Sequence, residues 1–150
     1  MEPKEPLANR AALGKVRRAV VKIGSSLLTE LKGIASGIQW LLDRKIQVII
    51  VSSGAIACGM RWLGFEHKPH PMAELQACAA VGQPLLIQLY QKAFGEMPVA
   101  QVLLTRSDLE DRTRFLNAKH TLLKLLEHRA IPLINENDTV AVDEIRFGDN

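Results

Sequence analysis

The stretch Ile131-Pro-Leu-Ile-Asn-Glu-Asn-Asp138 joins a short apolar run to a cluster of amide and carboxylate side chains. The apolar part, residues 131–134, predicts a buried strand. Polar side chains just beyond a strand end lie where open α/β sheets bind their ligands. Amides and carboxylates together can hold an amino group and a carboxylate at once. The stretch therefore indicates a site for a small zwitterion, and we expect Asn135 and Asp138 to belong to it.

Apolar runs and helical spacing alternate along the rest of the chain. Three further strands are predicted over residues 18–23, 46–51 and 98–104, and helices are predicted over residues 31–44, from Ser52-Ser53-Gly54 to about Trp62, and over residues 72–80, 84–94 and 113–128. The run of residues 46–51, which is more continuously apolar than that of residues 18–23, is typical of a parallel strand that is covered on both faces. Strands that alternate with helices predict an α/β fold with a mainly parallel sheet.

Length and composition favour one ordinary globular domain. The chain has 150 residues, of which 47% are hydrophobic and 23% charged, with a net charge of +3 and 5% aromatics. A nucleic-acid-binding protein usually has a longer basic stripe or aromatic stacking platforms. The basic group of Lys15, Arg17 and Arg18 is better explained as the solvated start of a strand, so we expect no nucleic-acid partner.

Targeting and metal signals are not evident. Residues 1–16 are expected to be a loose leader without an apolar run of signal-peptide length, and no segment has the roughly 18–20 apolar residues that span a bilayer. Cys58 and Cys78 lack metal-binding spacing and are expected to be free thiols in a reducing compartment. We therefore expect a soluble cytoplasmic protein with no metal-ligating residues and no membrane partner.

Two charged groups of the chain are best explained as surface features. The four histidines are scattered and are expected to lie in solvent. The mixed charges of residues 106–114 predict a solvated helix start, although they could also line a subunit contact or cover a substrate.

Lys22 is the first candidate for chemistry, because it precedes Gly24 and Ser25 at a predicted strand end. A lysine there could neutralise charge on a phosphoryl group during transfer. The neighbouring glycine and serine would let phosphate oxygens approach backbone N–H groups. An edge-strand lysine in solvent is the alternative, and this segment alone favours it.

Ser53 and Gly54 form the second candidate, at the junction between a strand and a helix. Hydroxyls and free N–H groups at a helix start can bind the carboxylate of a substrate. An ordinary helix cap is the commoner role for such residues. Neither a P-loop nor a dinucleotide fingerprint is found in the sequence, and no G-x-S-x-G motif surrounds Ser53, which argues against a serine hydrolase.

Taken together, several segments resemble the glutamate 5-kinase family of the amino acid kinase superfamily. The resemblance rests on Val20–Thr29, Val51–Ala57, Ala79–Gln83, Leu104–Arg106, Arg114–Ala118, Ile134–Asp138 and Gly148–Asn150. It runs in order from about Arg18 to the last residue. The Asn-Glu-Asn-Asp-Thr-Val element with a later Gly-Asp-Asn is its most specific part.

The resemblance implies a three-layer sandwich and ATP-dependent phosphorylation of the side-chain carboxylate of L-glutamate. The product would be γ-glutamyl phosphate, in the first step of proline synthesis, with ATP and Mg²⁺ as cofactors. Lys22 corresponds to the lysine that contacts the phosphates and stabilises the transferring group, and Gly24 and Ser25 adjoin it. The substrate-binding positions implied are Ser53, Gly54, Asn135, Asp138, Asp149 and Asn150. A homo-oligomer and feedback inhibition by proline are also implied.

The family continues beyond Gly-Asp-Asn with a nucleotide-binding half. We therefore expect residues 17–150 to be the N-terminal, amino-acid-binding part of an amino acid kinase domain, inactive by itself. Two alternatives remain open: a non-catalytic module that binds glutamate or proline, and a superfamily enzyme with another substrate.

Overall fold

A computed structural model describes residues 16–141 of the chain. Its elements, in chain order, are β1 (Arg18–Ile23), the 3₁₀ helix η2 (Ser25–Glu30), α1 (Leu31–Asp43), β2 (Gln47–Ser52), α2 (Ala55–Leu63), α3 (Met72–Phe94), β3 (Val99–Leu104), α4 (Arg106–Glu110), α5 (Arg112–Glu127) and β4 (Ile131–Glu136). No helix within these residues is long and apolar enough to cross a membrane.

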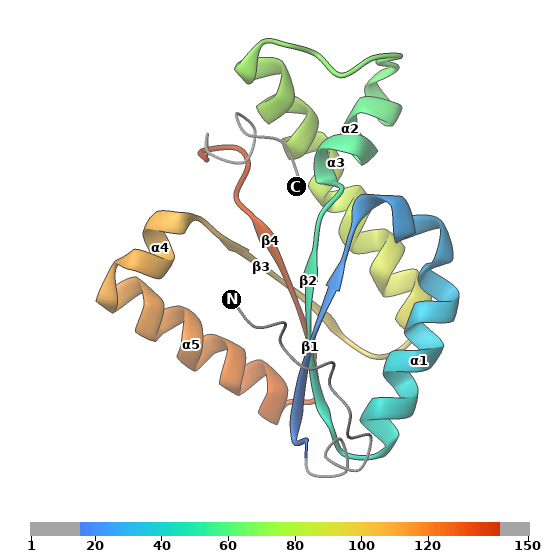
Figure 1. The fold of residues 1–150 in the computed structure, drawn as a ribbon, viewed down its shortest axis with the longest axis vertical. Helices are drawn as coiled ribbons and strands as arrows, with labels where there is room; N and C mark the ends of the chain where they lie inside the picture. The colour runs from blue at the N-terminus through green and yellow to red at the C-terminus, as the bar shows by residue number, and fades with distance from the viewer. Residues whose placement is uncertain (1–15, 142–150) are drawn as a thin grey trace, which may run out of the picture.

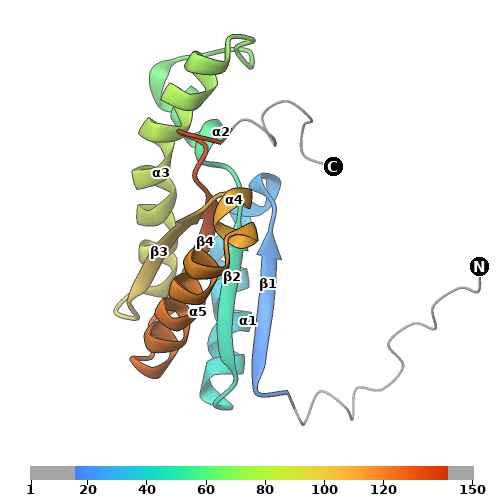
Figure 2. The same ribbon diagram turned by 90° about the vertical axis from the view of Figure 1, so that its left-hand side faces the viewer.

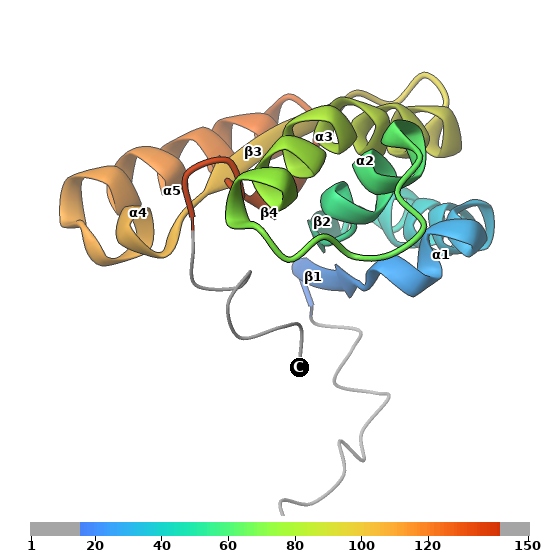
Figure 3. The same ribbon diagram turned by 90° about the horizontal axis from the view of Figure 1, so that it is seen from above.

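The four strands form one parallel sheet in the order β1-β2-β4-β3. Helices α1 and α3 cover one face of the sheet, and α5 covers the other (Figure 1). The same three layers are seen from above in Figure 3. The α/β class, the parallel sheet and the layered architecture predicted from the sequence are therefore confirmed.

The core fills the space between the sheet and the α1/α3 layer. Ile50, Leu86, Tyr90 and Leu133 are fully buried there. The Tyr90 hydroxyl lies 2.8 Å from the Ser52 hydroxyl, so the polar tip of this tyrosine has a partner in the core. This contact ties the end of β2 to α3.

The opposite face of the sheet is covered only in part by the described helices. Figure 2 shows α5 in front of β3 and β4, whereas β1 stands clear of it. Val20 in the middle of β1 is 65% exposed, and Arg18 and Lys22 on the same face are also exposed. The first strand is thus an edge strand whose outer face is open in the described part of the chain.

One local prediction was wrong. The segments 72–80 and 84–94, which the sequence predicts as two helices joined at Gly82-Gln83-Pro84, form the single helix α3 with Pro84 inside it. Proline lacks the N–H that would bond the carbonyl of Ala80. Helix α2 packs directly against α3 at Cys78 and Gly82, next to this proline, and such tertiary contacts outweigh the loss of one helical hydrogen bond. Residues 106–110 form a separate short helix, α4, with a capping box between Thr105 and Asp108.

Three helices end in the same hydrogen-bonded turn, but with different residues at its left-handed position. Gly64 occupies it after α2, while Lys45 follows α1 with φ of 63° and Arg129 follows α5 with φ of 58°. In each turn the residue after the left-handed one donates five positions back, as Ile46 does to the Leu41 carbonyl. Residues with a Cβ are strained in this conformation.

Replacing Lys45 by glycine should therefore raise the free energy of unfolding by about 0.5–1 kcal/mol, because glycine adopts this conformation without strain. Urea unfolding followed by circular dichroism measures the change. Gly64→Ala is the matched control and should lower the stability by a similar amount, since its added Cβ meets no described atom within 4 Å and only the backbone strain remains. An unchanged midpoint for Lys45→Gly would contradict the expected strain.

Candidate active site

A cavity of about 200 Å³ lies at the carboxyl ends of the strands. It is lined by Ser25, Ser53, Gly54, Ala55, Ile56, Ala57, Met60, Lys68, Asn135 and Asp138. Pockets for drug-sized ligands usually measure roughly 300–1,000 Å³. This cavity is smaller and mixes polar with apolar surface, so it suits a small metabolite.

The end of β2 and the turn after β1 form one wall of the cavity. The Ser53 N–H donates to the Ile23 carbonyl at 3.2 Å and holds the two strand ends together. Gly54 has a φ of 110°, and a Cβ there would lie 2.7 Å from Cδ1 of Leu28 and 3.2 Å from Cβ of Ser25. Glycine is thus required both by its backbone conformation and by the close approach of Ser25.

The first turn of α2 forms the floor of the cavity. Ala55, Ile56 and Ala57 line it, and the residue at the N-cap, Gly54, has no side chain to cap the helix. The first N–H groups of a helix have no partner within the helix and carry its positive dipole end. Beside a cavity lined by serine hydroxyls, these groups can bind a carboxylate.

The end of β4 and the turn after it form the opposite wall. Asn135 is 7% exposed, and its side-chain amide donates to Oε1 of Gln83 in α3 at 2.8 Å. Asp138 lies half-buried in the following turn and brings a carboxylate to the cavity. An ammonium group is the natural partner for such a carboxylate.

The contact between α2 and α3 fixes the position of the floor. A Cβ on Gly82 would lie only 1.7 Å from the Ala55 carbonyl oxygen, and one on Gly59 only 1.8 Å from the Cys78 carbonyl oxygen. The two backbones therefore touch at these glycines. Further along α3, burial raises the pKa of the Tyr90 hydroxyl, so Tyr90 stays neutral in its bond to Ser52.

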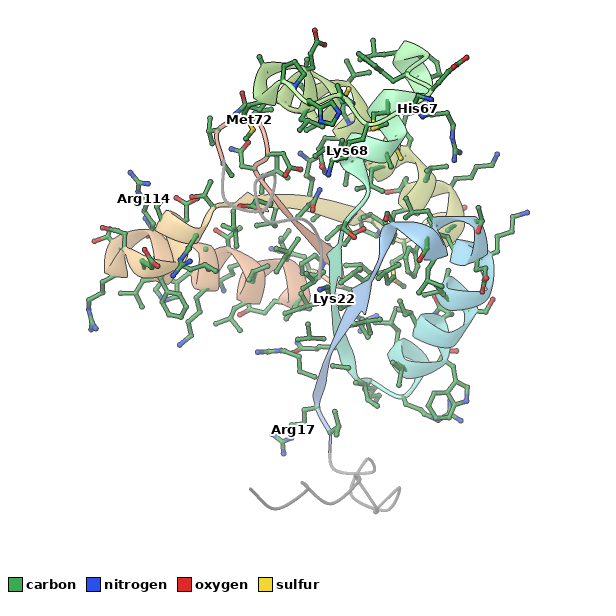
Figure 4. The ribbon with its side chains drawn as sticks, turned by 45° about the horizontal axis from the view of Figure 1, so that its top comes forward. Arg17, Lys22, His67, Lys68, Met72 and Arg114 are labelled. Atoms are coloured by element: carbon green, nitrogen blue, oxygen red, sulfur yellow. The ribbon has the colours of Figure 1, made fainter. Side chains whose placement is uncertain are left out.

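Lys68 lies at the rim of the cavity, on the loop between α2 and α3 (Figure 4), and was not among the residues predicted for the site. Its side chain is exposed. Nothing in the local sequence distinguishes Lys68 from an ordinary surface lysine. Its place beside the cavity depends on how α2 and α3 pack, because its loop joins these two helices. With Lys68 and Asp138 the cavity carries charges of both signs, which is the pattern that a zwitterion needs.

The structure brings together five of the residues predicted from the sequence. Ser25, Ser53, Gly54, Asn135 and Asp138 all line the cavity.

The other predicted residues do not line this cavity or cannot be placed. Lys22 pairs with Val51 near the end of β1 and is exposed on the sheet face opposite to Ile23. Figure 4 shows it beside β1 and β2, well below Lys68. Gly24 adjoins the wall but is not among the lining residues, and Asp149 and Asn150 lie outside the described residues.

A larger hollow of about 690 Å³ lies at the opposite end of the sheet, where β2 begins. Its lining includes Gln47, Met97, Glu127 and Arg129. Ligands of parallel α/β sheets bind at the carboxyl ends of the strands rather than at this end. The smaller cavity is therefore the better candidate for an active site.

Comparison with known proteins places the chain in a family. Residues 17–150 match the amino acid kinase family, and the chain belongs to it. The chain is 53% identical over 144 residues to a glutamate 5-kinase of Thermus thermophilus, covering 89% of this chain and 39% of that protein. It is 54% identical over 153 residues to glutamate 5-kinase of Carboxydothermus hydrogenoformans, covering 94% of this chain and 41% of that protein.

The chain thus spans about two fifths of the length of these curated relatives. Among solved structures, aspartate kinase from Synechocystis aligns with 77% of this chain and 21% of its own, at a TM-score of 0.45 and 11% identity.

Gly82→Ala tests whether the close contact between α2 and α3, which fixes the floor of the cavity, can be widened without loss of stability. The new methyl group must displace the Ala55 carbonyl, so the variant should lose about 1–3 kcal/mol of stability, as overpacked sites do. Thermal or urea unfolding measures the loss.

Gly37→Ala in α1 is the matched control, because a Cβ at Gly37 meets no described atom within 4 Å. It should gain about 0.5–1 kcal/mol from helix propensity. Equal free energies of unfolding for the two variants would show that α2 can move away from α3 without a loss of stability.

Proposed function

We propose that the protein containing this chain is a glutamate 5-kinase, which transfers the γ-phosphoryl group of ATP to the side-chain carboxylate of L-glutamate. The product is γ-glutamyl phosphate, and the reaction is the first step of proline synthesis in the cytoplasm. On this proposal residues 17–150 are the amino-acid-binding part of the kinase domain. Feedback inhibition by proline and assembly into a homo-oligomer belong to the same proposal.

The observation that carries the proposal is the pairing of opposite charges in one small cavity. Asp138 offers an anion for the ammonium group of glutamate, while Lys68 and the first turn of α2 offer positive partners for its carboxylates. The names of relatives at about half identity support glutamate rather than another amino acid.

The reaction fits a cavity without an acid–base residue. A carboxylate is already a nucleophile, so phosphoryl transfer to it needs positioning and charge neutralisation rather than a general base. Within residues 16–141 no histidine lines the cavity. Ser53 and the N–H groups of α2 would hold the accepting carboxylate in place.

The residues at the cavity fit Mg²⁺ only as an ion carried by the nucleotide. In the described part of the chain no group of three or more His, Cys, Asp or Glu side chains could hold a metal. Magnesium in kinases commonly relies on substrate phosphates and one or two carboxylates. It would supply charge neutralisation at those phosphates, while Asp138, the carboxylate of the cavity lining, is left for the ammonium group of the substrate.

The test is an assay of the complete gene product with ATP, Mg²⁺ and L-glutamate, in which the acyl phosphate is trapped with hydroxylamine. Formation of the hydroxamate with glutamate, and not with aspartate, is the expected result. Binding of glutamate without any hydroxamate would favour the alternative of a non-catalytic binding module. The exposed position of Lys22 away from the cavity lining is the observation in favour of that module.

Asp138→Ala in the complete protein should raise the KM for glutamate far more than the KM for ATP. Loss of a charge-assisted hydrogen bond to the ammonium group costs about 1.5–3 kcal/mol, or roughly ten- to hundredfold in affinity. Steady-state kinetics measure both constants. Asp43→Ala, at the far end of α1, is the control and should leave both unchanged, and a glutamate KM for Asp138→Ala within about twofold of wild type would remove Asp138 from the site.

Lys22→Ala should lower kcat strongly and leave glutamate binding nearly intact, because its charge is expected to act on the phosphoryl group during transfer. Lys22→Arg should rescue poorly, since guanidinium is wider and planar. Arg18→Ala removes a cation from the same face of the same strand and serves as the control. A kcat for Lys22→Ala close to that of wild type at saturating ATP would mean that Lys22 is an ordinary edge-strand lysine.

A further inference from the structure

A buried pair of amides joins the cavity to α3. Gln83 is 8% exposed and Asn135 is 7% exposed, and Nδ2 of Asn135 donates to Oε1 of Gln83 at 2.8 Å. Asn135 lines the cavity, whereas Gln83 lies behind it and does not. Any effect of Gln83 on the cavity would therefore pass through Asn135.

The direction of this hydrogen bond decides what Asn135 can offer a ligand. An asparagine side chain has one group that donates and one that accepts. Because Nδ2 is directed to Gln83, Oδ1 is the group that remains for the cavity, and it can only accept. If both amides were reversed, the cavity would meet an NH₂ group instead, which would suit a carboxylate and repel an ammonium.

The pair is not explained by stability alone. Nε2 of Gln83 is buried without a hydrogen-bond partner among the described residues, and a buried donor without an acceptor is unfavourable. The backbone beside Gln83 is also fixed, because Gly82 packs directly on the Ala55 carbonyl. Gln83 thus holds its Oε1 against the Asn135 amide from a fixed backbone, while its Nε2 is left without a hydrogen bond.

We propose that Gln83 is a positioning residue that holds the Asn135 amide with its carbonyl oxygen available to the cavity, as an acceptor for the amino group of the substrate. The proposal rests on the function proposed above, since it takes L-glutamate as the ligand. Asp138 and Oδ1 of Asn135 would then share the ammonium group, and Gln83 would determine the preference for an amino acid over the same dicarboxylate without the amino group.

The experiment compares L-glutamate with glutarate, which lacks only the amino group. Both are titrated calorimetrically into the complete gene product, as wild type and as Gln83→Met, which keeps the side-chain length but cannot hydrogen-bond Asn135. We expect Gln83→Met to weaken glutamate about tenfold or more, as the loss of a bond to a charged group does, and to change glutarate little. Gln83→Glu keeps an acceptor for Asn135 and should preserve the preference for glutamate.

Gln91→Met is the matched control on the same helix. Gln91 bonds backbone groups of Gly95, Met97 and Val99 at the far end of α3. Its loss should lower stability without changing the ratio of the two affinities. In an Asn135→Asp variant both side-chain oxygens are acceptors, whatever their orientation. Adding Gln83→Met to that variant should therefore change the ratio of the glutamate and glutarate affinities by less than about twofold. Such non-additivity is expected when one residue acts through the other.

The possible failures are distinguishable. A wild-type protein that binds neither ligand overturns the proposed function and this inference with it. A wild type that prefers glutamate, combined with equal weakening of both ligands by Gln83→Met, shows that Gln83 only supports the fold and overturns the inference alone. If Gln83→Met does not fold, loss of the preference in Gln83→Glu also overturns the inference, and its retention supports it.

Discussion

The direct contact between the backbones of α2 and α3 is the constraint on which the cavity depends. Gly59 and Gly82 allow the two helices to approach so closely that any side chain there would overlap a carbonyl group. This contact places the first turn of α2, with its free N–H groups, over the carboxyl end of the sheet. It also places Gln83 beside Asn135 and Tyr90 beside Ser52. One helix, α3, thus contacts the floor of the cavity and the ends of both central strands.

The sequence predicts the sheet well because its strands carry strong local signals. Residues 48–51 are continuously apolar, as is typical of a strand covered on both faces, and the observed strand is Gln47–Ser52. The continuity of α3 is not predictable from the same information. Pro84 and Gly82 normally interrupt a helix, and they are tolerated here only because α2 packs against this part of α3, a partner that local sequence does not specify.

The same distinction separates the predicted from the unpredicted parts of the site. Ser53 and Gly54 follow β2, Asn135 lies near the carboxyl end of β4 and Asp138 follows it, and parallel strands bring such positions to one edge of the sheet. Lys68 and Gln83 come from a loop and from the middle of a helix. Their places beside or behind the cavity follow from tertiary packing alone. The roles of Lys22, Asp149 and Asn150 in catalysis and binding stay predictions.

The arrangement of charges also orients the proposed substrate. Acceptors for an ammonium group, Asp138 and Asn135, lie at the β4 wall, while Ser25 lies at the wall next to β1. Glutamate held by its amino group at β4 would therefore extend its side-chain carboxylate toward β1. Lys22 lies near the end of that strand, on the face that α5 leaves open. On this proposal the accepting carboxylate and the cation would lie near the same strand end, and the phosphoryl group would enter over the carboxyl end of β1.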